Sequence, residues 1–256
     1  MNSKDLTYVK KDSFRGIEEN REISYTPKES FSKTVNFKDV SSNYMKRDIS
    51  KEPETFIIMI SGGKKREKDY FRLILDNPNL FPALKCIFIA QEKKLHPQGL
   101  LEIAKLQIEH YSHTENEQKP DEYYLITDID HFKDQVLDIK QECTSNINLI
   151  ISNPCFEVWL YYSWFNDKFT KFSIPKRKSQ LSKSVKKFVG DSIAGGIDPT
   201  KSIYKLETNI KNSLRNYALD KCNNIPDLFS TDMHKVGRKI LPFIKSYLDS
   251  YSDSHN

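Results

Sequence analysis

Cysteines are few in this chain, and those present form no recognisable framework. Cys86, Cys143, Cys155 and Cys222 lie far apart in the 256 residues, and none is part of a Cys-x-x-Cys pair. No histidine stands near them at the spacing of zinc ligands. This pattern argues against a zinc finger and against a disulfide framework. The four cysteines are expected to be reduced thiols in a core.

Long apolar runs are absent as well. No segment approaches the roughly 20 apolar residues that cross a bilayer, and the polar N-terminus lacks the apolar stretch of a signal peptide. Neither sign of charge dominates, since 40 Lys and Arg residues face 35 Asp and Glu residues and leave a formal net charge of +5. We therefore expect a soluble, cytoplasmic protein with no membrane partner, whose mild positive charge permits a nucleic-acid partner.

The apolar residues that are present suffice for a core. Hydrophobic residues make up 38% of the chain and aromatic residues 12%, with a mean hydropathy of -0.64. Residues 1–54 contribute little, because the polar composition of this segment buries too little surface to offset the entropy of ordering. We predict a polar N-terminal arm at 1–54, partly disordered or loosely packed.

An α/β core is predicted at residues 55–165. Apolar runs of strand length alternate with segments whose apolar residues repeat at helical spacing. Strands are expected at 56–60, 84–89, 123–128 and 147–151, and helices at 67–75, 99–111 and 132–143. This alternation indicates a mainly parallel sheet flanked by helices, whose ligands bind outside the carboxyl ends of the strands.

Residues 166–256 are predicted to form a basic, helical C-terminal extension. Asp198 suits a helix N-cap, with Pro199 in the first turn. Thr231 is likewise expected to cap a final amphipathic helix, which is expected to bend at Pro242.

Two acids mark the end of the third expected strand. The apolar run that starts at Tyr123 ends in Asp128 and Asp130. Positions i and i+2 of a strand point to the same side, so the two carboxylates can converge on one divalent cation at the sheet edge. The pattern predicts metal-assisted phosphoryl chemistry at this edge of the sheet.

A third acid follows the fourth strand. Asn153 is expected to cap a helix and Pro154 to occupy its first position, which puts Glu157 in the first turn near the same sheet edge. Glu157 can thus join Asp128 and Asp130 as a metal ligand. The alternative is an ordinary acid at a helix N-terminus, where a negative charge is favourable by about 0.3 to 1 kcal/mol.

The turn after the first strand could hold a phosphate. It joins two glycines to Lys64, Lys65 and Arg66 just before a helix N-terminus. The turn lacks the spacing and the terminal Gly-Lys-Ser/Thr of a Walker loop, which argues against an ATPase. A solvated turn with surface lysines is the competing interpretation.

A second basic segment lies farther along the chain. Lys176, Arg177 and Lys178 stand among aromatic residues, a mixture that suits a phosphate backbone and stacked bases. His131, beside Asp130, could contact phosphate or assist proton transfer. The alternatives are a solvated charged face and a polar loop histidine.

Two strings of residues resemble segments of a known family. They are Ser152-Asn153-Pro154-Cys155-Phe156-Glu157-Val158-Trp159-Leu160 and Thr127-Asp128-Ile129-Asp130-His131-Phe132. Both are similar to segments of the RloB-like family, whose core is a Toprim-type α/β domain. The resemblance extends over residues 56–165 and, more weakly, over 229–236.

The resemblance implies a phage-defence protein of abortive-infection loci with metal-dependent nuclease activity on RNA, such as tRNA, or on DNA. It also implies a partner ATPase of the ABC or AAA type, and it leaves self-association open. Toprim domains place one acid after the first strand and an Asp-x-Asp pair after the third, and the resemblance implies that these acids bind Mg²⁺ or Mn²⁺ as the cofactor. Asp128 and Asp130 match the pair, and Glu157 matches the glutamate of the family's Asn-Pro-Cys-Phe-Glu segment.

The first Toprim element departs from the pattern, because Gly62 stands where its glutamate is expected. Glu67, on the following helix, is the catalytic candidate in its place, or else an ordinary first-turn acid. Two functions therefore compete, an active nuclease and a catalytically degenerate scaffold that serves as a sensor or regulatory binding module. Phosphotransfer or phosphohydrolysis on a nucleotide is a third class.

Overall fold

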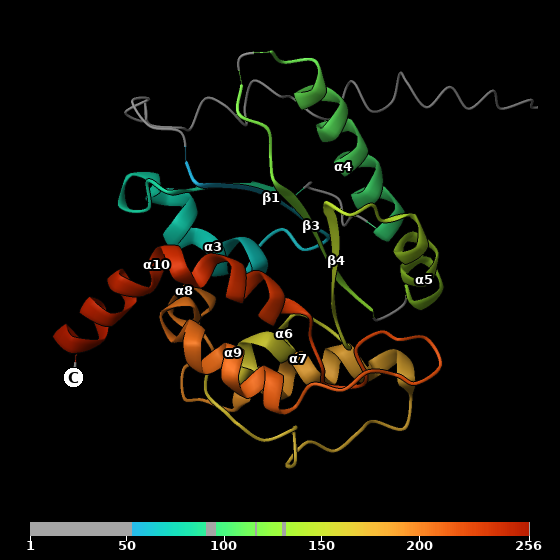
Figure 1. The fold of residues 1–256 in the computed structure, drawn as a ribbon. Coiled ribbons are helices and arrows are strands. Elements are labelled where there is room, and N and C mark those ends of the chain that lie inside the picture. The colour runs from blue at the N-terminus through green and yellow to red at the C-terminus, as the bar shows by residue number, and fades with distance from the viewer. Residues whose placement is uncertain (1–52, 91–95, 116, 130–131, 256) are drawn as a thin grey trace, which may run out of the picture. The chain divides into compact units, whose positions relative to one another are not determined.

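Four parallel strands form the centre of the molecule (Figure 1). The computed structural model describes residues 53–90, 96–115, 117–129 and 132–255. The strands are β1 (Thr55–Ser61), β2 (Leu84–Ile89), β3 (Glu122–Asp128) and β4 (Ile147–Ser152), in the spatial order β2-β1-β3-β4. Each neighbouring pair is parallel. The predicted α/β fold is confirmed, and its layout is the one expected of a Toprim-like sheet.

Both faces of the sheet are covered, which explains why the strands read as continuous apolar runs. Successive side chains of a strand point to opposite faces. In β1, Phe56 and Ile58 belong to one buried cluster, whereas Ile57 and Met59 belong to another. All four are fully buried.

Helices fill the connections and the C-terminal extension. They are α3 (Arg66–Asp76), α4 (Pro97–Ser112), α5 (Lys133–Glu142), α6 (Glu157–Tyr162), α7 (Leu181–Asp191), α8 (Pro199–Ser202), α9 (Leu206–Arg215) and α10 (Met233–His255). Short 3₁₀ segments occur at Pro78–Leu80, Lys178–Gln180 and Ile203–Lys205. Helices α4 and α5 cover one face of the sheet, and α3, α6, α9 and α10 lie on the other (Figure 1).

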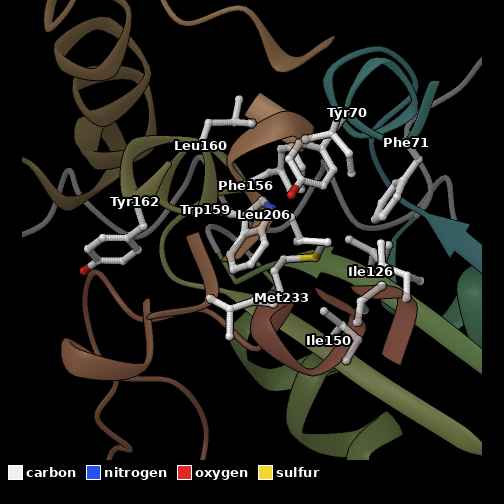
Figure 2. Close-up of a cluster of buried hydrophobic side chains, with 14 of the residues drawn as sticks. Tyr70, Phe71, Ile126, Ile150, Phe156, Trp159, Leu160, Tyr162, Leu206 and Met233 are labelled. Carbon is white, nitrogen blue, oxygen red and sulfur yellow. The ribbon is translucent and has the colours of Figure 1, made fainter. Parts of the chain in front are cut away.

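The larger core joins the sheet to the C-terminal helices. Figure 2 shows Trp159 of α6 in one cluster with Tyr70 of α3, Leu206 of α9 and Met233 of α10. The rings of Trp159 and Tyr70 meet edge to face, with centroids 6.0 Å apart. The predicted C-terminal extension is therefore helical and shares the core of the sheet.

Hydrogen bonds join the segment before α10 to the end of β4. The hydroxyls of Thr231 and Ser152 lie 2.8 Å apart, and the Asp232 N–H donates to the carbonyl of Ile151 (2.8 Å). Thr231 Oγ1 also accepts from the N–H of Met233 (3.2 Å), which confirms the predicted cap. These bonds fix α10 relative to the sheet edge from which α6 departs.

The predicted start of α6 is wrong. Helix α6 begins at Glu157, with Phe156 in the preceding position, rather than at Pro154. The Asn153 side chain does not cap it, because its amide donates to the carbonyl of Pro226 (2.9 Å). Glu157 nevertheless lies in the first turn, as predicted.

The expected helix after Asp198 is interrupted. Asp198 does cap its start, since its carboxylate accepts from the N–H of Thr200 (2.9 Å). The segment then runs as α8, a 3₁₀ turn and α9 rather than as one continuous helix.

No disulfide joins the four cysteines, all of which are among the described residues, so they are thiols as predicted, but one prediction about their location is wrong. Cys86 and Cys155 are buried and Cys143 is half-buried, whereas Cys222 is exposed. Among the described residues, no helix combines the length and the apolar character that a membrane crossing requires.

Candidate metal and active site

The order of the strands reverses between β1 and β3, so the carboxyl ends of these two strands are the expected ligand site. From β1 the chain crosses to β2 on one side, and β3 then returns to the other side of β1. Open α/β sheets bind ligands at such a reversal. Ser61 ends β1 beside Ile126, and Asp128 ends β3 two residues farther on.

Asp128 is held by the segment that leads into α6. Its Oδ1 accepts from the backbone N–H of Phe156 (2.8 Å). The side chain is 14% exposed, so it reaches the rim of the site without entering bulk solvent. This hydrogen bond from a backbone N–H fixes the orientation of the carboxylate.

Glu157 is more deeply buried than a simple first-turn acid would be. Its side chain is only 5% exposed, and its Oε1 lies 3.6 Å from Nε of Arg66. Its Oε2 lies 3.8 Å from Nζ of Lys186. Within the described part of the chain, Oε2 has no hydrogen-bond partner. A buried carboxylate oxygen in this state is available to a ligand.

The structure adds Lys186 of α7, which the sequence analysis did not assign to the site. Its ammonium lies 3.9 Å from Oδ2 of Asp128 and 3.8 Å from Oε2 of Glu157. Burial acts to lower the pKa of Lys186, but the carboxylates of Glu157 and Asp128 outweigh it and raise the pKa above its ordinary value. The ammonium therefore stays charged between two acids.

Glu67 belongs to the same cluster. It is buried in the first turn of α3. Burial raises the pKa of Glu67, and the nearby Glu157 raises it further, while Lys186 and Arg66 act in the opposite direction. The structure thus brings Glu67, Asp128 and Glu157 to one edge of the sheet.

The predicted phosphate-binding cations divide into two groups. Arg66 pairs with Glu157, as described above, and its side chain is 43% exposed. Lys64 and Lys65 are exposed at the start of α3 and line an open hollow along that helix.

The second predicted basic segment is not brought to the acids. Lys176, Arg177 and Lys178 are exposed before α7, the first two in a loop and Lys178 at the start of the 3₁₀ segment Lys178–Gln180. In the described parts of the chain, none of the three pairs with an acid of the cluster. Their role in nucleic-acid binding stays a prediction.

Asp130 and His131 lie outside the described residues, so the Asp-x-Asp pair is described only through Asp128. Among the described side chains, no group of three His, Cys, Asp or Glu residues is arranged to hold a metal ion. Asp128 and Glu157 nevertheless present one oxygen each to a single cationic position, and carboxylate oxygens are the ligands that Mg²⁺ prefers. Mg²⁺ commonly takes one or two protein carboxylates, so this donor set fits it.

The sequence of the chain matches the model of one protein family. The family model for RloB-like proteins matches residues 57–240, which run from β1 into α10 and include Glu67, Asp128, Glu157 and Lys186. Searches of curated proteins and of solved structures found no match. The family match covers well over half of the chain and spans the segments that build the site. The chain therefore belongs to the RloB-like family.

Proposed function

We propose that this protein is a Toprim-like nuclease of antiphage defence that requires Mg²⁺ or Mn²⁺, cuts RNA or DNA and is controlled by a partner ATPase. The observation that supports the proposal is the position of Asp128 and Glu157. Both acids face one cation at the sheet edge where α/β folds bind ligands, with Glu67 beside them.

Asp128 and Glu157 would hold the metal ion, together with Asp130 from the Asp-x-Asp pair. When bound, the metal would act as a Lewis acid toward a phosphoryl oxygen of the nucleic acid. The N–H of Phe156 would keep Asp128 oriented throughout. Burial of Glu157 would keep water from competing for its oxygens.

Glu67 would serve as the proton acceptor in place of the glutamate that Gly62 replaces. A general base works best when its pKa lies near the operating pH, and burial raises the pKa of Glu67 in that direction. Arg66, half-exposed at the mouth of the cluster, would bind the phosphate. Lys64 and Lys65 would neutralise the phosphates that flank it.

The test is a cleavage assay on the full-length chain with labelled tRNA, single-stranded DNA, plasmid and nucleoside triphosphates, each with Mg²⁺ or Mn²⁺. Asp128→Asn and Glu157→Gln should each lower the rate by about 100-fold or more. Asp138→Asn, an exposed acid of α5 on the other face of the sheet, is the matched control and should keep the rate. Equal rates in wild type and Asp128→Asn would remove the proposal.

The products of the same assay separate polymer from monomer substrates. A nuclease shortens tRNA or DNA and leaves nucleoside triphosphates intact. Release of phosphate from the triphosphates alone would instead identify a nucleotide phosphohydrolase.

The competing function is a degenerate scaffold that senses or binds a partner. Two observations favour it: Gly62 stands at the usual glutamate position, and a lysine already neutralises the acids. Isothermal titration with Mg²⁺ and Mn²⁺ distinguishes the two, because a scaffold should bind neither at millimolar concentration. Appearance of activity only in Gly62→Glu would also favour the scaffold.

The defence role and the ATPase rest on family membership. Cells that carry the gene with its neighbouring genes should resist phage, and Asp128→Asn should abolish that resistance. Purification of the tagged protein from the same cells should recover an ATPase. Undiminished resistance with Asp128→Asn would separate defence from catalysis.

A further inference from the structure

The ammonium of Lys186 stands where a metal ion would bind. It lies within 4 Å of one oxygen of Asp128 and one oxygen of Glu157, at 3.9 Å and 3.8 Å. These are the two described carboxylates assigned to the metal. A divalent cation that bound both oxygens would therefore lie close to the ammonium, and like charges at such a distance repel strongly.

The ammonium is held loosely. Both distances exceed the length of an N–H···O hydrogen bond, about 2.7 to 3.2 Å. Oε2 of Glu157 has no hydrogen-bond partner within the described residues even though the ammonium faces it. Lys186 thus neutralises Glu157 by charge without satisfying its hydrogen-bonding capacity.

Lys186 also has a route out of the site. Its side chain is 44% exposed, in contrast to 5% for Glu157. The helix that carries it is fixed, because Val185 and Val189 of α7 are fully buried in the larger core. The four-carbon stem can therefore swing toward solvent while the backbone stays in place.

We propose that Lys186 is a tethered counter-ion that occupies the cation position between Asp128 and Glu157 and leaves it when a divalent metal ion binds. The inference rests on the metal site of the proposed function and adds its regulation. Without metal, Lys186 keeps two partly buried acids from repelling each other. With metal, the ammonium moves to the rim and can meet the phosphate. Competition with Lys186 weakens metal binding, so a higher concentration of metal ion is needed to fill the site.

The test compares Mn²⁺ affinity in wild type, Lys186→Met and Lys183→Met by isothermal titration of the full-length protein without nucleic acid. Lys186→Met should bind Mn²⁺ about tenfold more tightly, because the competing cation is gone. Lys183, exposed on the same helix, is the matched control and should leave the dissociation constant within about twofold. Weaker or unchanged binding in Lys186→Met overturns the inference.

A second measurement needs no variant and so does not depend on its folding. Brief treatment of wild type with acetic anhydride, followed by mass spectrometry, reports how accessible each lysine is. Saturating Mn²⁺ should increase the labelling of Lys186 several-fold and leave Lys183 unchanged. Equal or reduced labelling of Lys186 contradicts its displacement.

The outcomes separate this inference from the proposed function. If wild type and Lys186→Met bind Mn²⁺ equally well and the protein cleaves nucleic acid, only the counter-ion role fails. If Lys186→Met binds Mn²⁺ more tightly but neither protein cleaves any substrate, the counter-ion role stands and the nuclease fails. If neither protein binds Mn²⁺, the metal site fails, and both ideas fail with it.

Discussion

At the scale of single residues, the position of the Glu67 carboxylate depends on Gly63. The carboxylate of Glu67 folds back over Gly63, so closely that a Cβ added at Gly63 would overlap it. The backbone of Gly63 is not in a left-handed conformation, so the requirement comes from this close approach alone. Sequence reasoning assigned the two glycines to a flexible phosphate loop and did not predict this contact.

Gly63→Ala should therefore force the carboxylate of Glu67 into another position, which should destabilise the protein by about 0.5 to 1.5 kcal/mol. In the double variant Gly63→Ala, Glu67→Ala the clash is absent, so the two effects should be non-additive by about 0.5 to 3 kcal/mol. Urea unfolding measures all three variants. Gly190→Ala is the control, since its Cβ would meet nothing within 4 Å. Additive effects would show that Glu67 is not held against Gly63.

Glu67 also predicts a pH dependence of stability. Burial raises the pKa of Glu67 in the folded state above its ordinary value of 4.5. At a pH between 4.5 and the raised pKa, Glu67 keeps its proton in the folded state and releases it in the unfolded state. The free energy of unfolding therefore falls as the pH rises through this range. Glu67→Gln cannot ionise and should lack this fall.

Urea unfolding from pH 4 to pH 8 measures the difference between wild type and Glu67→Gln. As the pH increases, the free energy of unfolding of Glu67→Gln should rise relative to that of wild type. Glu109→Gln, an exposed position on α4, serves as the control. If the difference in free energy of unfolding between wild type and Glu67→Gln stays constant across this range, burial does not raise the pKa of Glu67.

At the scale of elements, α10 contains a proline, a residue that is unfavourable inside an α-helix. Pro242 lies inside this 23-residue helix and is exposed. A proline there removes one backbone hydrogen bond, the one to the carbonyl of Arg238, and its ring crowds that carbonyl. The helix forms nonetheless, because Val236, Ile240 and Ile244 are fully buried in the larger core. Packing outweighs propensity in this element.

Pro242→Ala should stabilise the protein by about 1 to 2 kcal/mol, since the gain of the missing bond exceeds the extra entropy of the unfolded chain. Denaturant unfolding measures the change. Ser246→Ala, also exposed on α10, should give only about 0.5 kcal/mol through helix propensity. A loss of stability in Pro242→Ala would mean that the shape imposed by the proline is needed for α10 to pack.

At the scale of the whole molecule, residues on both sides of position 165 share one core. The larger cluster takes side chains from β1, α3 and α6 and also from α7, α9 and α10. Removal of either part would expose apolar surface on the other. This arrangement favours one cooperative unfolding transition over separate melting of the C-terminal helices.

The prediction is that tryptophan fluorescence and far-ultraviolet circular dichroism report the same urea midpoint. Trp159 is fully buried and Trp164 is 38% exposed, so Trp164→Phe leaves a single reporter in the core. Its fluorescence follows the packing of α6, whereas circular dichroism follows all helices. Two separate midpoints would show that the C-terminal helices unfold on their own.

The sequence by itself determined the local elements and the acidic strand tip. Strand and helix positions follow from apolar periodicity and from caps such as Asp198, which act over a few residues. The placement of Asp128 at a sheet edge follows from a strand that ends there. Residues 1–52 of the predicted N-terminal arm, Asp130 and His131 lie outside the described residues, so what the sequence indicates for them stays a prediction.

Only the tertiary structure decided which distant side chains meet. Lys186 lies 58 positions after Asp128, and no spacing rule connects them; the packing of α7 against α6 does. Asn153 likewise has a distant partner, because its side-chain amide donates to the carbonyl of Pro226 and does not cap α6. Local patterns fix elements because their energies depend on neighbouring residues. Contacts within the site depend on how those elements pack, and packing is set by the core as a whole.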